Sequence, residues 1–223
     1  RGNMQLSILI PSHRGDLLAC SRIFQACSWA GPNLEVIVRD NSGNAFKRSL
    51  LAHIKRDHCN IIHVEPCTAL ENHTEIVRLA KGNYIYVIAD DDFAFDRAIT
   101  SLPSLLDRHV NDRSVAGIIG TYVVEHSNGS TIVGYDNVDS EDVTARVSSY
   151  LAYQGVNVLY YSPIRRDLSQ RIFAFTGAMP FRFPFHDQII CLLCLLNGKF
   201  ARLKRLMYLY DISDWDQAAV AQR

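Results

Sequence analysis

The chain has 223 residues, of which 48% are hydrophobic and 21% are charged, a composition typical of a globular protein rather than a disordered one. Its 23 Lys and Arg residues balance its 23 Asp and Glu residues, so it lacks the basic surface of nucleic-acid-binding domains, and we expect no nucleic-acid partner. A neutral chain can still bind a small anion, because a metal ion or a helix N-terminus supplies positive charge locally.

The first half of the chain alternates between strand and helix patterns. Apolar runs predict strands over residues 6–10, 34–40, 60–65 and 84–89. Apolar residues at helical spacing predict helices between them, over residues 16–29, 45–58 and 70–81. This alternation indicates an α/β fold with a mainly parallel central sheet and helices on both faces.

The second half has a different pattern. It predicts a helix over residues 95–109 that is interrupted near Pro103, and an antiparallel hairpin of strands at 115–126 and 131–136. Ser162-Pro163 is a plausible helix start. Helices at 140–155 and 187–198 and a strand at 200–210 complete a smaller antiparallel region.

The N-terminal apolar segment does not have the pattern of a signal peptide. We therefore expect a reducing, cytoplasmic location, in which the six cysteines act as small buried residues. Cys191 and Cys194 share an apolar helical run, but the sequence offers no second pair to complete a structural zinc site. No run approaches the roughly 20 apolar residues of a membrane span. We expect no integral span, and leave peripheral association with the inner membrane face open.

Polar residues follow three of the predicted strands. They are Pro11-Ser12-His13-Arg14, Asp40-Asn41-Ser42 and Asp90-Asp91-Asp92. In open parallel sheets, ligands bind at the carboxyl ends of the strands, so these segments are candidates for one site. Alternate residues of an extended segment point the same way, and two carboxylates on one side suit a hard divalent cation. The alternative is a set of helix-capping, solvated acids.

Three spaced motifs carry a family resemblance. The order ILIPSHRGDLL, VIVRDNS and AKGNYIYVIADDD resembles the nucleotide-binding half of family-2 glycosyltransferases of the GT-A fold, over roughly residues 5–95. The resemblance implies a single GT-A-type domain over residues 4–223. Its nucleotide-sugar-binding half would be residues 4–95, and its acceptor-side half residues 96–223.

The resemblance implies roles on the donor side. Asp40 would accept a hydrogen bond from the nucleotide base, although a turn-only role for this residue stays open. Asp90 would face the ribose or sugar and share a Mg²⁺ or Mn²⁺ ion with Asp92, and Asp91 would serve substrate binding through a supporting hydrogen bond. Pro11, Ser12 and His13 would border the base and ribose, unless His13 is a simple surface residue.

The acceptor side resembles the family less closely. His186-Asp187 stands where the family has Glu-Asp, and Asp187 would be the catalytic base that deprotonates the acceptor hydroxyl, with His186 beside the substrate. The alternative role for Asp187 is a first-turn acid of the helix that follows. On the donor side, His73-Thr74 replaces the family's Arg-Asn, which weakens the expectation of diphosphate contacts there. Asp211, after the last predicted strand, is a candidate third metal ligand.

The resemblance thus implies a metal-dependent, base-catalysed transfer of a sugar from a nucleotide-diphosphate donor to a hydroxyl acceptor, with inversion. The acceptor would be a glycan or a lipid-linked molecule, in glycan or polysaccharide biosynthesis. The departures at His73-Thr74 and His186 leave a non-catalytic nucleotide- or glycan-binding homologue as an alternative. A sugar-phosphate nucleotidyltransferase is disfavoured, because PSHRGD holds one glycine where that class has a Gly-rich loop.

Overall fold

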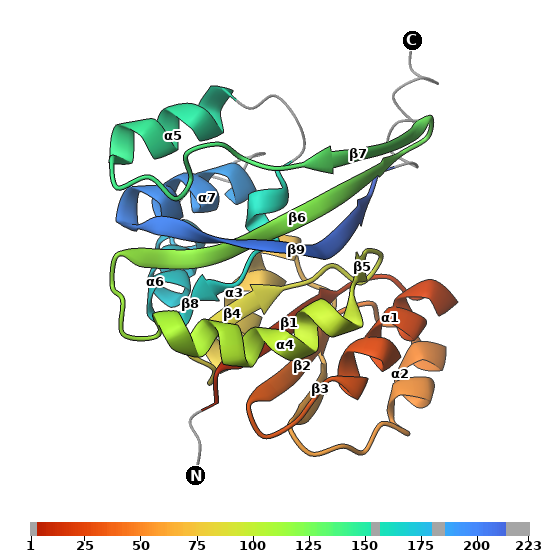
Figure 1. Ribbon diagram of the computed structural model, residues 1–223. Coiled ribbons are helices and arrows are strands. Elements are labelled where there is room, and N and C mark those ends of the chain that lie inside the picture. The colour runs from red at the N-terminus through yellow and green to blue at the C-terminus, as the bar shows by residue number, and fades with distance from the viewer. Residues whose placement is uncertain (1–3, 153–156, 180–185, 213–223) are drawn as a thin grey trace.

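The computed structural model describes residues 4–152, 157–179 and 186–212. Strands and helices alternate through the first half, as the sequence predicts (Figure 1). In chain order its elements are β1 (Leu6–Ser12), α1 (Leu17–Ser28), β2 (Leu34–Asp40), α2 (Ala45–Leu51), β3 (Cys59–His63), α3 (Ala69–Leu79) and β4 (Tyr84–Val87).

Within the described residues, the second half adds two short strands, four helices, one long hairpin and the 13-residue strand β9. The predicted hairpin forms from β6 and β7, which pair antiparallel. In chain order the elements are β5 (Phe93–Ala94), α4 (Asp96–Leu106), a 3-10 turn (Asp107–His109), β6 (Val115–His126), β7 (Gly129–Val133), α5 (Val143–Ala152), a 3-10 turn (Val158–Tyr160), β8 (Ile164–Arg165), α6 (Arg166–Gly177), α7 (His186–Asn197) and β9 (Lys199–Asp211).

One mixed sheet runs through both halves, in the order β3-β2-β1-β4-β8-β6-β9-β5, with β7 paired to β6. Four of its pairings are parallel: β1 lies beside β2 and β4, β2 beside β3, and β6 beside β9. The strand order reverses at β1, since β2 and β3 lie on one side of it and β4 on the other. Such a reversal leaves a crevice at the carboxyl ends of the strands.

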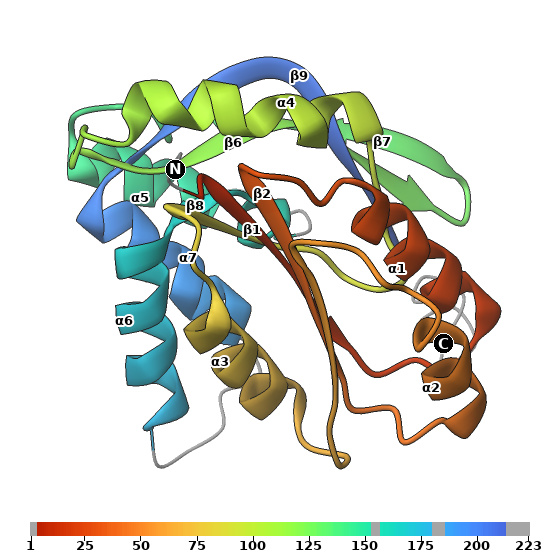
Figure 2. The same cartoon turned by 90° about the horizontal axis from the view of Figure 1, so that it is seen from below.

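Helices cover both faces of the parallel strands. In Figure 2, α1 and α2 lie on one side of β1 and β2, whereas α3, α6 and α7 lie on the other. Strands β1, β2 and β4 are therefore almost wholly buried, as a sheet covered on both faces requires. Within the described ranges, no helix is long and apolar enough to cross a bilayer.

Side-chain caps fix where three of the helices begin. Asp16 Oδ1 accepts from the N–H of Ala19 at 2.9 Å, and Asn44 Oδ1 accepts from the N–H of Lys47 at 2.9 Å. Thr68 forms a capping box with Glu71 at the start of α3. These caps satisfy N–H groups that a helix leaves unpaired, and they hold the loops that follow β1 and β2.

A close approach of the backbone explains Gly82, which precedes β4. A Cβ at this position would lie 2.6 Å from the carbonyl carbon of Leu6 and the nitrogen of Ser7. Only glycine lets the chain enter β4 this close to β1.

The expected break at Pro103 is wrong. Helix α4 is continuous, with Pro103 inside it, and the 3-10 turn follows only after Leu106. Pro103 is buried with Leu102 and Leu106 on the apolar face of α4. Burial of this face outweighs the backbone hydrogen bond that proline removes.

The helix expected over residues 45–58 is too long, because α2 ends at Leu51. The chain has to turn into β3, where Cys59 pairs with Val36. His58 adopts a left-handed φ of 61°, and its carbonyl accepts from the N–H of Val36 at 2.9 Å.

The helix expected to start at Ser162-Pro163 begins at Arg166 instead. Ile164 and Arg165 form β8, which pairs with Ile85 and Tyr84 of β4. This short strand joins the parallel half of the sheet to β6, a role that the local sequence does not reveal.

Candidate functional site

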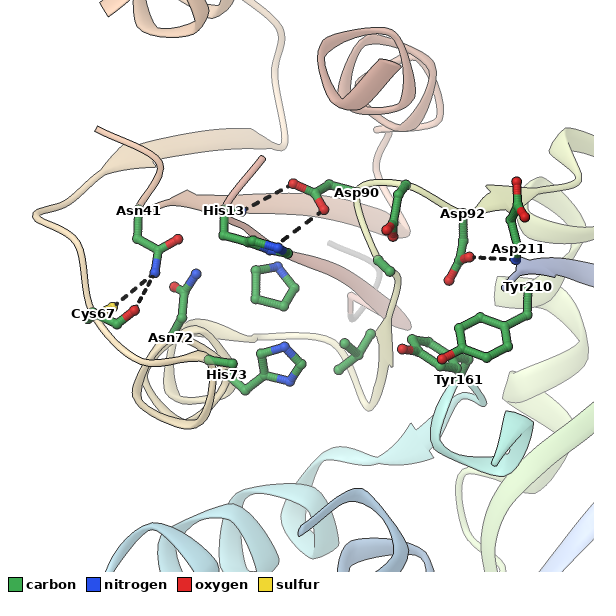
Figure 3. Close-up of a pocket in the computed structure, with 15 residues that line it drawn as sticks. His13, Asn41, Cys67, Asn72, His73, Asp90, Asp92, Tyr161, Tyr210 and Asp211 are labelled. Carbon is green, nitrogen blue, oxygen red and sulfur yellow. Dashed lines mark hydrogen bonds and ion pairs between the residues drawn. The ribbon is translucent and has the colours of Figure 1, made fainter. Parts of the chain in front are cut away.

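A cavity of about 300 Å³ lies at the carboxyl ends of β1, β2 and β4, where the strand order reverses (Figure 3). Six residues from the predicted strand-end segments line it: Pro11, His13, Asn41, Asp90, Asp91 and Asp92. The sequence analysis did not single out six other lining residues, which are Cys67, Ala69, Asn72, Val87, Ala89 and Tyr161. Its location matches the binding crevice of open α/β sheets.

Asp90 holds the loop that follows β1. Its Oδ2 accepts from the backbone N–H groups of His13 and Arg14 at 3.2 and 3.1 Å, and from the hydroxyl of Ser12. Ser12 is fully buried behind the cavity, whereas the side chain of His13 is 73% exposed at its rim. Asp90 therefore fixes the position of the loop backbone at His13.

Lys47, on α2, is fully buried and connects two of these strand ends. Its Nζ lies 2.9 Å from Asp40 Oδ1 and donates to Ser12 Oγ at 2.5 Å and the Arg14 carbonyl at 2.6 Å. The sequence analysis missed this residue. Leu51 could have indicated it, because residues four apart lie on the same face of a helix and an apolar Leu51 predicts that this face is buried.

Asp40 is buried and does not line the cavity. Burial acts to raise its pKa, but the bonds from Lys47, Ser42 and His63 outweigh burial and hold the pKa below its ordinary value. The Nδ1 of His63 lies 2.9 Å from Asp40 Oδ2, and the N–H of Ser42 donates to Oδ1 at 3.2 Å. The carboxylate is therefore charged and already has partners within the protein.

Asn41 presents an acceptor to the cavity in place of Asp40. Its Nδ2 donates to the carbonyl of Cys67 at 2.8 Å, which fixes the orientation of the amide. Its Oδ1 is buried and has no hydrogen-bond partner among the described residues. A buried acceptor without a partner is costly, so this atom suits a donor N–H or O–H of a ligand.

Asp91 and Asp92 both line the cavity but bond in different directions. Asp91 accepts from Arg14 Nη1 at 3.1 Å, whereas Asp92 accepts from the Tyr208 hydroxyl at 2.7 Å and the N–H of Asp211 at 2.9 Å. Burial raises the pKa of Asp91, and Asp90 adds to the rise. Burial also raises the pKa of Asp92 to about 7, with a further contribution from Asp91 and Asp211.

A divalent cation would relieve the repulsion between the carboxylates of Asp91 and Asp92, because a nearby positive charge favours their ionised forms. Asp91, Asp92 and Asp211 line the same cavity and offer the oxygen ligands that Mg²⁺ and Mn²⁺ prefer. However, no group of three or more His, Cys, Asp or Glu residues in the described ranges could hold a metal by itself. The residues fit a cation only when substrate oxygens and water complete its coordination.

Two histidines, His73 of α3 and His186 of α7, pack together beside this cavity. His73 lines it, and burial lowers the pKa of His73 to about 3, with His186 and His13 adding to the effect. His73 is therefore neutral at pH 7 and bonds to the Tyr160 hydroxyl. The ring of His186 meets that of His73 edge-on, with centroids 6.5 Å apart.

Asp187 lies in the first turn of α7 and is half-buried. Its Oδ2 accepts from Asn157 Nδ2 at 3.0 Å, and it does not line the cavity. It nevertheless acts on the cavity wall electrostatically, since it contributes to the raised pKa of Tyr210, after burial, Asp92 and Asp91. Residues 180–185, which precede α7, lie outside the described residues.

Comparisons with known proteins support the fold. A scan of the sequence against protein-family models and a search of curated proteins find no match. The structure is similar to that of S. aureus TarS, with a TM-score of 0.60 and 14% identity over 97% of this chain and 38% of that one. A crystal structure of TarS 1-349 in complex with UDP-GlcNAc gives a TM-score of 0.58 at 14% identity, over 93% of this chain and 58% of that one.

The chain thus spans less than two thirds of the TarS chains that it matches. The match to TarS, a family-2 glycosyltransferase of the GT-A fold, confirms the predicted fold class. At 14% identity this likeness concerns the fold alone.

Proposed function

We propose that this chain, which has the GT-A fold, is a glycosyltransferase that moves a sugar from a nucleotide-diphosphate donor to a hydroxyl acceptor. The observation that carries the proposal is the cavity at the reversal of strand order. It has the unpaired acceptor of Asn41 in its wall together with the carboxylates of Asp91 and Asp92. TarS has been crystallised with UDP and with UDP-GlcNAc, so UDP-GlcNAc is the first donor to test.

The base of the donor would lie beside Asn41, with Pro11 and His13 at its border. Asn41 Oδ1 would accept from an N–H of the base, since this atom has no partner among the described residues. Asp40 would act at the same end as a positioning residue, because Lys47 and His63 already engage its carboxylate. This differs from the direct base contact that the family resemblance implies for Asp40.

The diphosphate would lie toward Asp91 and Asp92. These two side chains, with Asp211 beside them, would hold a Mn²⁺ or Mg²⁺ ion, which would stabilise negative charge on the leaving diphosphate. Asp90 would contribute less directly, because its Oδ2 already accepts three hydrogen bonds from the loop after β1. Its role would be to position His13 at the donor.

Asp187 would be the general base. It would take the proton from the acceptor hydroxyl as the oxygen attacks the anomeric carbon from the face opposite the nucleotide, which gives inversion. Asn157 would orient the carboxylate through its 3.0 Å hydrogen bond. His186 and the neutral His73 would line the path between Asp187 and the donor. We propose a glycan or lipid-linked acceptor.

Thermal unfolding tests donor binding. UDP-GlcNAc and other nucleotide sugars should raise the melting temperature of the wild-type protein, and the rise should require manganese or magnesium. Asp92→Asn should lose the metal-dependent rise, whereas Asp57→Asn, an exposed carboxylate just before β3, should keep it. If no donor stabilises the protein, or if Asp92→Asn responds like wild type, the proposed donor site is wrong.

A second candidate function is nucleotide-sugar binding without turnover, and the absence of Asp187 from the cavity wall favours it. The two are separated by a product assay with a panel of hydroxyl acceptors. A transferase forms product, and Asp187→Asn removes that activity while donor affinity by calorimetry stays unchanged. A binding protein shows the same donor affinity and no transfer or donor hydrolysis with either form.

A further inference from the structure

Two cysteines that are far apart in the sequence meet on the side of the sheet that α1 covers. Cys27 stands in the last turn of α1, and Cys59 is the first residue of β3. Their sulfur atoms are 3.0 Å apart, close enough for a thiol to hydrogen-bond to its neighbour. All six cysteines lie within the described residues and carry free thiols.

The two thiols differ in exposure and in acidity. Cys27 is only 3% exposed, whereas Cys59 is half-buried. The hydrogen bond with Cys27 and the charge of Arg56 lower the pKa of Cys59, against the effect of burial. The same contact with Cys59, followed by burial, raises the pKa of Cys27. Cys59 is therefore the more acidic and the more accessible of the two thiols.

We propose that Cys27 and Cys59 form a redox-modification site, which closes to an intrachain disulfide when the protein meets a peroxide. The site belongs to α1 and β3, and neither cysteine lines the cavity. The proposal is therefore independent of the proposed glycosyl transfer.

The chemistry balances with hydrogen peroxide as the oxidant. The Cys59 thiolate attacks one peroxide oxygen, so an S–O bond forms, the O–O bond breaks and the departing hydroxide takes a proton to become water. Cys27 Sγ then attacks the sulfur of the Cys59 sulfenic acid. The S–S bond forms, the S–O bond breaks, and the departing hydroxide leaves as water with the Cys27 proton. Two thiols and one peroxide give one disulfide and two waters.

The crosslink would enclose residues 28–58, which include β2 and α2. Within this loop lie Asp40 and Lys47, whose ion pair supports the end of β1 behind the cavity. Closing a loop of this length restricts the unfolded chain, so the oxidised protein should melt roughly 5–10 °C higher than the reduced protein.

The test treats the native protein with equimolar hydrogen peroxide, blocks the remaining thiols with N-ethylmaleimide and maps peptides without reduction. We expect two thiols to be lost and one linked peptide to appear, which joins Cys27 to Cys59. Dithiothreitol should return the melting temperature to that of the reduced protein. Recovery of both cysteines as maleimide adducts would overturn the proposal. So would a linked peptide that involves another cysteine, or oxidation of Cys59 to the sulfinic acid with Cys27 still free.

Three variants make the test specific. Cys27→Ala and Cys59→Ala should each abolish the linked peptide and the rise in melting temperature. Cys20→Ala removes another buried thiol of α1 and should retain both. If Cys27→Ala shows the same oxidative rise as wild type, the disulfide is not its cause and the proposal fails. Peptide mapping of the wild-type protein tests the proposal even if a variant does not fold.

Discussion

Replacing Asp92 by asparagine should make the protein more stable at alkaline pH while it removes a residue of the proposed donor site. Asp92 is 2% exposed, and its pKa is raised from 3.8 to about 7, mainly by burial. Asparagine keeps the shape of the side chain and carries no charge at any pH. The substitution therefore separates the energetic cost of the charge from its proposed use.

The direction and size of the effect follow from proton linkage. Because the pKa of the folded state lies above that of the unfolded chain, the folded protein binds a proton that the unfolded chain has already lost. The contribution of Asp92 to stability is therefore greatest below pH 3.8 and falls as the pH rises to about 7. A difference of about three pKa units corresponds to about 4 kcal/mol at alkaline pH, since one unit is worth about 1.4 kcal/mol.

The variant escapes this loss but weakens one of two hydrogen bonds. A carboxylate accepts from both Tyr208 and the N–H of Asp211, whereas an amide has a single oxygen. This costs about 1 kcal/mol. Relative to wild type, Asp92→Asn should therefore gain roughly 2–3 kcal/mol in unfolding free energy between pH 5 and pH 8.5.

Urea unfolding in the presence of a chelator, at four pH values in that range, measures the effect. Asp57→Asn, an exposed carboxylate, serves as the control and should follow the wild-type curve. If the stability of Asp92→Asn stays parallel to wild type across the range, Asp92 is not the strained carboxylate that its burial implies.

Three further substitutions test the supports of the site. Lys47→Met should cost about 3–5 kcal/mol in urea unfolding, because it leaves the Asp40 carboxylate buried without its cation. Lys47→Met combined with Asp40→Asn should recover part of the loss. A loss below about 1 kcal/mol would contradict the assigned pairing. Gly82→Ala should lower the free energy of unfolding by about 1–3 kcal/mol, since its methyl group would lie 2.6 Å from backbone atoms of Leu6 and Ser7. Gly134→Ala, where the added carbon has open space, should be nearly neutral by the same assay. Asn41→Ala should weaken donor binding about tenfold in calorimetry through the loss of one hydrogen bond, and an unchanged dissociation constant would exclude Asn41 as the base contact.

The sequence predicted the fold where local patterns decide it. The strand expected over residues 34–40 is β2 without a change of boundary, because an apolar run between two turn segments has little local alternative. The hairpin of β6 and β7 was predicted for the same reason. Where contacts with other elements decide, the local pattern failed. Helix α4 continues through Pro103, and the residues after Pro163 form β8 instead of the start of a helix.

The candidate site was predicted in outline but not in its bonding. Polar residues after three strands were expected to meet, and those at His13, Asp90, Asp91 and Asp92 line one cavity. The sequence did not reveal Lys47, because a helical lysine is usually solvated, and only packing of α2 against the end of β1 buries this one.

What the sequence by itself determined is the alternation of elements and the positions of polar residues at strand ends, because both follow from periodicity within a few residues. Only the tertiary structure decided which partner each carboxylate has. Asp92 bonds to Tyr208, 116 residues away, because β9 lies parallel to β6 and brings its end to the cavity. Pairing between strands so distant depends on how whole layers pack, and no local pattern specifies it.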